Sequence, residues 1–423
     1  MIDFVETVRS LMKTRWLCRT GQTREQFDGW QQRALQKWLL NDVPEVQFYK
    51  TSSGKLSDLP IIDKATVMQD FSAFNKHGVN ADQVRTALST TMKIGKLTVG
   101  ASTGTSGNRG FFVISEQEKF RWLGTMLAKT MPDLLLQKQR VAVLLPQGGQ
   151  LYDSANNASR IELKLFNLVD GVEQWRDQLE AFNPTLIVAP PKVLRYLSEE
   201  NYRLTPKRIF SAAETLDPMD RMLVEAHFET KLEQIYMATE GLLGVTCRHG
   251  TLHLAEDSIH FEYESVSDDL VMPIVTCFQR TTQIMARYRM NDLLRLSDKP
   301  CPCGSPLQAV DEIVGRMDDC FEFTTNSNTT ILVTPDVLRN TILDANRRID
   351  DFKLSQIGPE AMVLKLPVDL TDGEIETVKS ALCILLKKRN VDPKIETERV
   401  SFSLDTSRKL RRVERCFVAK DIS

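Results

Sequence analysis

The sequence predicts an α/β protein with a large N-terminal domain and a small α+β C-terminal domain. Between residues 91 and 240, helical patterns alternate with short apolar runs, which is typical of a layered α/β architecture with much parallel sheet. Residues 330–402 follow the order strand, helix, strand, strand, helix, strand, which is that of a small ferredoxin-like module. A chain of 423 residues also exceeds the usual size of one hydrophobic core, so two or three domains are expected.

Residues 1–90 are predicted to be mainly helical. Apolar side chains recur at helical spacing between Phe27 and Leu39, and Leu59-Pro60 interrupts the pattern. In the α/β part, strands are expected at four apolar runs: 141–145, 185–189, 208–210 and 234–236.

Residues 241–316 are predicted to form a β-rich subdomain. Strands are expected at 258–263 and 270–277, with turns and little helical periodicity around them. The change of pattern near 316–322 places a domain boundary there. We therefore expect an N-terminal domain of residues 1–316 and a C-terminal domain of residues 317–423, with helices at 336–348 and 372–389.

The composition is that of an ordinary globular protein, with 42% hydrophobic and 26% charged residues. A net charge of -2 gives no electrostatic reason to expect nucleic acid or an anionic membrane as a partner. Charged residues interrupt the first 17 positions, so this stretch resembles neither a signal peptide nor a membrane span. Eight cysteines are too few for a disulfide scaffold. We expect a cytoplasmic protein, and a homodimer remains open.

A loop rich in glycine and hydroxyl groups follows the apolar run Leu97–Val99. Its residues are Ser102, Thr103, Gly104, Thr105, Ser106, Gly107, Asn108, Arg109 and Gly110. Such glycines let backbone N–H groups approach an anion, and the side chains add donors. The Walker and dinucleotide-binding patterns do not fit this loop. By itself the composition also fits a flexible surface loop, so the rest of the chain must decide.

Four further segments carry polar residues at informative places. Residues 211–216 and 236–241 each end a predicted strand, where open α/β sheets place ligand sites. Residues 287–293 and 314–319 follow in the β-rich region and at the domain boundary. With the loop at 102–110, this ordered set resembles the acyl-adenylate-forming superfamily, and within it the phenylacetate-CoA ligase-like branch. The resemblance spans most of the chain, including the segment Leu59–Lys64 and a small C-terminal module similar to the mobile cap domain of that superfamily.

The resemblance implies a role for each motif in binding ATP. Residues Ser102 to Gly107 would hold the β- and γ-phosphates, with Arg109 in place of the usual lysine. Ala213 and Glu214 would line the adenine slot, and Tyr236 would stack on the base. Thr239 would contact the α-phosphate, and Glu240 would hold Mg²⁺, which prefers hard oxygen ligands. Considered one at a time, acidic residues such as Glu214 and Glu240 are usually carboxylates exposed on the surface.

The resemblance also implies a ribose site, a hinge and a catalytic lysine. Asp292 would accept the ribose hydroxyls, and Arg316 would reinforce this contact. Asp318 occupies the hinge position, where a few residues at the end of an element absorb a change of backbone angles. Lys409 matches the lysine of a Gly-Lys-x-x-Arg segment, although Arg408 replaces its glycine. Alternatively, Lys409 belongs to a solvated basic tail.

A zinc site is predicted in the β-rich region. Cys301 and Cys303 lie two residues apart, and Cys247, His249 and His253 precede them. Three thiolates and one imidazole would complete a tetrahedral zinc site, and the spacing allows either histidine. Similarity to some phenylacetate-ligase-like proteins favours His253. Four protein ligands leave no open position, so the zinc would be structural. The alternative is a pair of buried free thiols at a turn.

Together the motifs predict a ligase that converts a carboxylic acid to its acyl-AMP with ATP and Mg²⁺, and then to a thioester. The acceptor would be CoA or the phosphopantetheine arm of a carrier protein. An aryl or arylalkanoic acid is the favoured substrate and a fatty acid the second choice; residues 146–152 would border its pocket. A non-catalytic nucleotide-binding homologue is the alternative. A zinc-dependent nucleic-acid binder is disfavoured by the lack of basic and aromatic interleaving.

Overall fold

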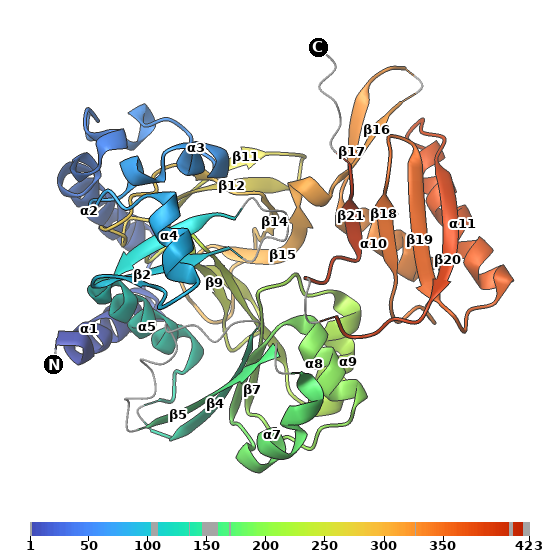
Figure 1. Cartoon of the computed structure of the whole chain (residues 1–423), viewed down its shortest axis with the longest axis horizontal. Helices are drawn as coiled ribbons and strands as arrows, with labels where there is room; N and C mark the ends of the chain where they lie inside the picture. The colour runs from blue at the N-terminus through green and yellow to red at the C-terminus, as the bar shows by residue number, and fades with distance from the viewer. Residues whose placement is uncertain are drawn as a thin grey trace. The chain divides into compact units, whose positions relative to one another are not determined.

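The computed structural model describes residues 2–102, 109–134, 136–145, 160–168, 171–325, 327–405 and 409–417. The chain forms two compact units (Figure 1). The first contains residues 1–290 and 295–311, and the second contains residues 291–294 and 312–423. Strands β14 (Asp292–Leu296) and β15 (Ala309–Arg316) have residues in both units.

The first 90 residues are mainly helical, as predicted. They form α1 (Ile2–Leu17), α2 (Arg24–Asn41), α3 (Lys64–Gln69) and α4 (Ala81–Leu88), with short 3₁₀ turns between them. Capping boxes fix two of the helix starts, Thr23 with Gln26 and Asn80 with Gln83.

The predicted parallel sheet is confirmed. Its strands lie in the order β5 (Ile161–Asn167), β4 (Gln139–Leu145), β6 (Leu186–Ala189), β7 (Arg208–Ala212) and β8 (Leu232–Ala238), all mutually parallel. Three helices follow strands of this sheet along the chain: α7 (Arg176–Phe182), α8 (Pro191–Glu199) and α9 (Pro218–Phe228).

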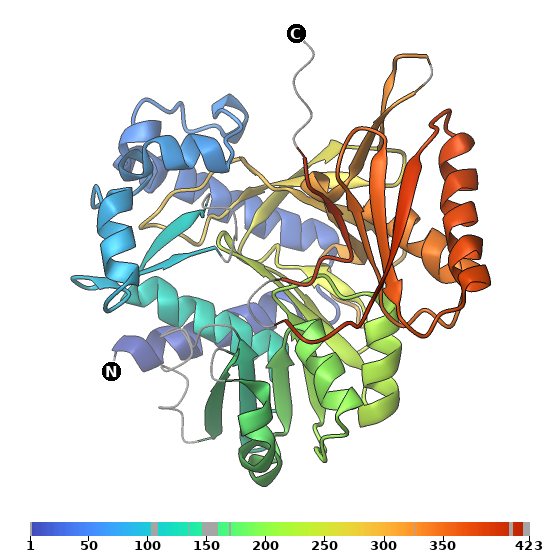
Figure 2. The ribbon, with the colours of Figure 1, turned by 45° about the vertical axis from the view of Figure 1, so that its right-hand side comes forward.

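The apolar core lies between this sheet and two helices that run side by side, α1 and α5 (Glu116–Thr130) (Figure 2). Alternate residues of the parallel strands, such as Val141 and Val143, pack against Leu11 and Leu123 of those helices. Helices α8 and α9 contact strands β7 and β8. The result is the layered α/β arrangement that the sequence predicts.

Beyond β8 the sheet becomes antiparallel, which confirms the predicted β-rich region. Strand β9 (Gly241–Thr246) pairs with β8, and β10 (Leu252–Leu254) pairs with β9 and β15. Strand β12 (Val271–Thr276) pairs with β11 (His260–Ser265) and β13 (Tyr288–Arg289). A separate three-stranded antiparallel sheet contains β1 (Lys93–Ile94), β2 (Leu97–Ala101) and β3 (Phe111–Ser115).

The second unit has the predicted order of elements with a different strand pairing. It contains a hairpin of β16 (Phe321–Thr324) and β17 (Thr330–Val333), followed by α10 (Pro335–Ala345), β18 (Lys353–Gln356), β19 (Ala361–Pro367), α11 (Asp372–Lys387), β20 (Lys394–Val400) and β21 (Val413–Arg415). The four-stranded sheet has the order β20-β19-β18-β21. The first predicted strand, β17, is outside it because it pairs with β16 in a separate two-stranded sheet; β21 pairs with β18 instead.

The described helices include none with the length and apolar character needed to span a bilayer.

Candidate active site and metal centre

The glycine- and hydroxyl-rich loop connects β2 to β3. The backbone N–H of Ser102 donates to the carbonyl of Gly110 at 2.8 Å, and the N–H of Gly110 donates to Ser102 Oγ at 2.9 Å. These bonds close the base of the loop. Arg109 is exposed beside it. The predicted phosphate-binding residues Thr103, Gly104, Thr105, Ser106 and Gly107 lie outside the described residues.

The segment Leu59–Lys64 lies beside two other motifs. Ile62 exchanges backbone hydrogen bonds with the 287–289 segment: its N–H donates to Arg287 O at 3.0 Å, and Arg289 N donates to Ile62 O at 2.8 Å. A Cβ placed on Gly110 would meet Lys64 Cε at 3.7 Å. The structure therefore brings the start of α3 to the base of the 102–110 loop.

The predicted adenine-slot residues lie at the carboxyl ends of two neighbouring parallel strands. Ala212 of β7 pairs with Ile235 of β8, so Ala213 and Tyr236 follow side by side at one edge of the sheet. Tyr236 is buried, and the β8–β9 register shifts between Tyr236 and Met237. Such an irregularity re-aims the following side chains.

The backbone at Ala213 is strained, with a φ of +69° that residues other than glycine rarely adopt. The next residue, Glu214, forms an ion pair with Lys192 Nζ at 3.1 Å, and the side chains are only 4% and 8% exposed. Strained backbone persists where the surroundings fix it, and such positions cluster at ligand sites. Lys192 is a residue that the sequence analysis missed.

Thr239 and Glu240 form the turn between β8 and β9. Thr239 Oγ1 donates to Glu240 Oε2 at 3.0 Å, and Glu240 is 6% exposed. Two side chains fix the backbone of this turn: Cys277 Sγ donates to Glu240 O at 3.2 Å, and Arg280 Nη2 donates to Thr239 O at 2.7 Å. Burial raises the pKa of the Cys277 thiol to about 12, so it is a neutral donor. The Glu240 carboxylate is a hard oxygen donor of the kind that Mg²⁺ takes together with phosphates and water.

The predicted ribose and hinge residues lie together in the second unit. Arg316 Nε is 3.8 Å from Asp292 Oδ1, and Asn291 Nδ2 donates to the carboxylate of Asp318. Met317 N also donates to Asn291 O at 2.8 Å. Asp318 lies in the 3₁₀ turn Met317–Asp319, at the end of β15.

Lys409 is exposed, directly before a basic segment that is not a solvated tail. Ion pairs join Arg411 to Asp319 at 3.2 Å, Arg412 to Asp351 at 2.7 Å and Arg415 to Glu322 at 2.5 Å. Burial raises the pKa of Asp319, while the Arg411 charge opposes this effect. These pairs anchor the chain that follows Lys409 to the second unit.

The predicted metal ligands lie together in the first unit. The ligand atoms of Cys247, His253, Cys301 and Cys303 lie within 4.8 Å of one another. Cys247 Sγ is 3.6 Å from Cys301 Sγ, and Cys303 Sγ is 3.3 Å from His253 Nε2. Tetrahedral zinc with Zn–S and Zn–N bonds of about 2.3 and 2.0 Å spaces its ligands roughly 3.5–3.8 Å apart, so this donor set fits zinc.

The surrounding residues select the histidine and support the cysteine turn. His253 Nδ1 is 2.9 Å from Leu307 O, which orients Nε2 toward the thiols as an outer hydrogen bond does in zinc sites. His249 is exposed and hydrogen-bonded to Arg248. Gly304 has a φ of +69°, and a Cβ there would meet Thr20 Cγ2 at 2.9 Å, so any other residue would strain this turn. Thr20 Oγ1 donates to Cys303 O at 3.0 Å.

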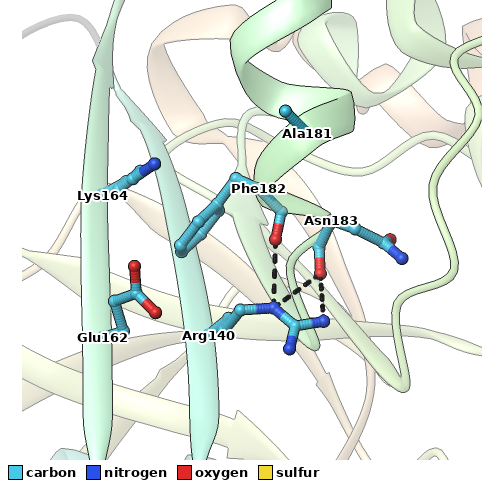
Figure 3. Close-up of a pocket in the computed structure, with 6 residues that line it drawn as sticks. All are labelled: Arg140, Glu162, Lys164, Ala181, Phe182 and Asn183. Carbon is cyan, nitrogen blue, oxygen red and sulfur yellow. Dashed lines mark hydrogen bonds between the residues drawn. The ribbon is translucent and has the colours of Figure 1, made fainter.

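The structure also contains a pocket of about 380 Å³ beside β4, β5 and the end of α7 (Figure 3). It is lined by Arg140, Glu162, Lys164, Ala181, Phe182 and Asn183. Arg140 and Glu162 lie near the amino ends of β4 and β5, opposite the edge where open α/β sheets place ligands. Its arginine already donates to the carbonyls of Phe182 and Asn183 at 2.7–3.0 Å. We therefore do not assign the pocket to the candidate active site.

No family model matches the chain. Protein CapK of Staphylococcus aureus is 29% identical to it over 135 residues, which are 31% of this chain and 30% of CapK. The chain thus matches less than a third of the length of this curated relative.

Several solved ligase structures share the fold. 2-Hydroxyisobutyryl-CoA ligase, in its postadenylation state with 2-HIB-AMP, is 17% identical with a TM-score of 0.71, and the match covers 94% of this chain and 91% of that one. One structure from a study of fatty acyl-adenylate ligases from E. coli and L. pneumophila is 12% identical, with a TM-score of 0.52, and the match covers 74% of this chain and 68% of that one. The amide bond synthetase McbA from Marinactinospora thermotolerans is 12% identical with a TM-score of 0.53 and the same coverage. The chain has the fold of the acyl-adenylate and CoA ligases.

Proposed function

We propose that the protein is a ligase that activates a carboxylic acid with ATP and transfers the acyl group to a thiol. The observation that carries this proposal is the arrangement at the carboxyl edge of the sheet. Ala213 follows β7, Tyr236 lies near the end of the adjacent strand β8, and Thr239 and Glu240 follow β8. The shared fold with 2-hydroxyisobutyryl-CoA ligase, a structure that contains an acyl-AMP, supports it.

In the first step, a carboxylate oxygen attacks the α-phosphorus of ATP, and the bond to the bridging oxygen of pyrophosphate breaks. The products are acyl-AMP and pyrophosphate. We assign the β- and γ-phosphates to the 102–110 loop, whose backbone donors would stabilise the charge that grows on the leaving group. We assign the α-phosphate to Thr239. We assign the adenine to a slot lined by Ala213, Glu214 and Tyr236. Mg²⁺ held by Glu240 would neutralise phosphate charge.

We assign the ribose hydroxyls to Asp292, supported by Arg316. Lys409 would balance negative charge on the carboxylate and the α-phosphate. In the second step, a thiolate attacks the acyl carbonyl carbon, which releases AMP and gives a thioester. We propose that residues 317–423 act as a cap domain and that Asp318 is the hinge between the two steps.

The acid is proposed by chemical class. An aryl or arylalkanoic acid is the favoured substrate and a fatty acid is the second choice. This preference rests on the resemblance to the phenylacetate-CoA ligase-like branch. Residues 146–152, the proposed border of its pocket, lie outside the described residues. CoA is the proposed acceptor, and a carrier-protein phosphopantetheine has the same reactive thiol.

We also propose that Cys247, His253, Cys301 and Cys303 bind one structural zinc ion. The distances between their donor atoms and the hydrogen bond that orients His253 support this assignment. Zinc would fasten the Cys301–Gly304 turn to strands β9 and β10, because its ligands come from both parts of the chain.

The test is carboxylate-dependent exchange of labelled pyrophosphate into ATP, run with Mg²⁺ against aryl, arylalkanoic and fatty acids. Exchange measures the first step without any acceptor. Exchange with one class of acid supports the ligase. ATP binding without exchange for any acid favours a non-catalytic nucleotide-binding homologue. Arg109 and Arg408 favour this alternative because they depart from the ligase pattern.

A further inference from the structure

Arg280 lies in a turn between the motifs to which the sequence analysis assigned roles. Its guanidinium contacts one of these motifs and the strand that follows another. Nη2 donates to the carbonyl of Thr239 at 2.7 Å, and the guanidinium carbon lies 5.9 Å from the centre of the Phe112 ring. The side chain therefore links the Thr239–Glu240 turn to strand β3.

The contact with Phe112 places this side chain near the base of the 102–110 loop. Phe112 pairs with Gly100 in the β2–β3 ladder, and the next pair, Ala101 with Phe111, is the last before Ser102 and Gly110. The Phe112 ring crosses Gly100, where any Cβ would lie 2.2 Å from it. Arg280 thus contacts both the strand that follows the loop assigned to the β- and γ-phosphates and the turn assigned to the α-phosphate.

The second terminal nitrogen of Arg280 is unused. Nη1 is buried and has no hydrogen-bond partner among the residues that the structure describes. Buried donors are nearly always paired with protein, water or ligand, so an unpaired charged one needs an explanation. A guanidinium has a planar fork of donors that matches phosphate oxygens.

The turn that carries Arg280 is held rigidly. The carbonyl of Arg280 accepts a hydrogen bond from Trp38 Nε1 at 2.6 Å, and the N–H of Arg280 donates to Cys277 O at 3.0 Å. The next two N–H groups, of Thr281 and Thr282, donate to Glu118 Oε1 at 2.6 and 2.9 Å. Burial alone would raise the pKa of Glu118, but these hydrogen bonds and those from Ser115 lower it, so Glu118 is a carboxylate. A site built on such support is preorganised.

We infer that Arg280 is a further phosphate-binding residue, whose Nη1 donates to a phosphate oxygen of ATP while Nη2 holds Thr239. The inference rests on the proposed function, because it needs ATP in that site. A lysine at this position would have a single ammonium nitrogen instead of a planar guanidinium. It could not donate to both the Thr239 carbonyl and a phosphate oxygen in the same geometry.

The experiment measures the binding of ATP and of adenosine by calorimetry, for the unaltered protein, Arg280→Gln and Arg280→Lys. Arg280→Gln is expected to weaken ATP binding about 10- to 100-fold, the effect of one hydrogen bond to a charged group, and to leave adenosine binding within about twofold. The ATP affinity of Arg280→Lys is expected to lie between that of the unaltered protein and that of Arg280→Gln. Arg33→Gln, on exposed α2 surface, is the matched control and is expected to bind ATP normally.

The outcomes separate the two proposals. If the unaltered protein does not bind ATP, the proposed function fails and this inference with it. If it binds ATP and Arg280→Gln binds equally well, only the inference is overturned. Where Arg280→Gln does not fold, a crystal structure of the unaltered protein with ATP decides: Nη1 within hydrogen-bond distance of a phosphate oxygen supports the inference, and Nη1 on water alone overturns it.

Discussion

Lys192 of α8 and Glu214 of the loop after β7 form a buried ion pair, with Nζ 3.1 Å from Oε1. The pair joins the start of a helix to the residue that follows the strained Ala213. A buried pair contributes little net stability compared with apolar residues, but removal of one partner leaves an uncompensated charge. The pair therefore fixes the position of the 213–216 segment more than it stabilises the fold.

Lys192→Met is expected to lower the free energy of unfolding by about 3 kcal/mol because the Glu214 charge stays buried without its partner. Lys192→Met combined with Glu214→Gln is expected to recover most of that loss. Urea unfolding of both variants measures this, with Lys231→Met at an exposed position as the control. Equal stability of the single and double variants would contradict the role given to the pair.

Zinc removal is expected to destabilise the first unit. The purified protein should contain about one zinc ion per chain, and a chelator or Cys303→Ser should lower both metal content and the thermal midpoint. His253→Ala should act in the same way because its Nε2 faces Cys303. His249→Ala is the matched control, since that side chain is exposed; loss of zinc in this variant instead would overturn the ligand assignment.

Lys409→Ala is expected to reduce pyrophosphate exchange about 100-fold or more, since one preorganised charge at a reacting centre has effects of this size. Thermal stability should change little because the side chain is exposed. ATP binding and exchange are measured in parallel, and Lys388→Ala after α11 is the control. Full exchange activity in Lys409→Ala would remove Lys409 from the reaction.

Stability is expected to fall between pH 7 and pH 5 in part through His260. Burial lowers the pKa of His260, while Glu262 and Glu256 oppose this effect, and its Nδ1 lies 3.0 Å from Gln31 Oε1. The unfolded chain then binds the proton more readily than the folded one, so this contribution is complete above the unfolded pKa of about 6.5 and is lost as the pH falls below it.

Urea unfolding at pH 5 and pH 7 of the unaltered protein and of His260→Gln checks the expectation. The loss of stability on acidification should be smaller in the variant, because glutamine does not titrate. His77→Gln, at an exposed histidine, should behave like the unaltered protein. An identical loss in all three proteins would mean that His260 does not control this pH range.

The sequence alone predicted the layered α/β class, the β-rich region and the order of elements in the C-terminal unit. Those features follow from local patterns, since residues 141–145 and 208–210 are apolar runs of strand length between helical periodicities. The segments that end β7 and β8 were recognisable because strand ends and polar residues coincide in the sequence.

Tertiary structure decided the contacts between residues far apart in the chain. The spacing allowed His249 or His253 as a zinc ligand; β10 pairs with β9 and β15, and this pairing carries His253 to the thiols. Lys192 and Arg280 have no local signal, because each acts on a residue 22 or 41 positions away. Sequence periodicity reports which face of an element is apolar, but the partner of a buried charge depends on which elements the fold brings together.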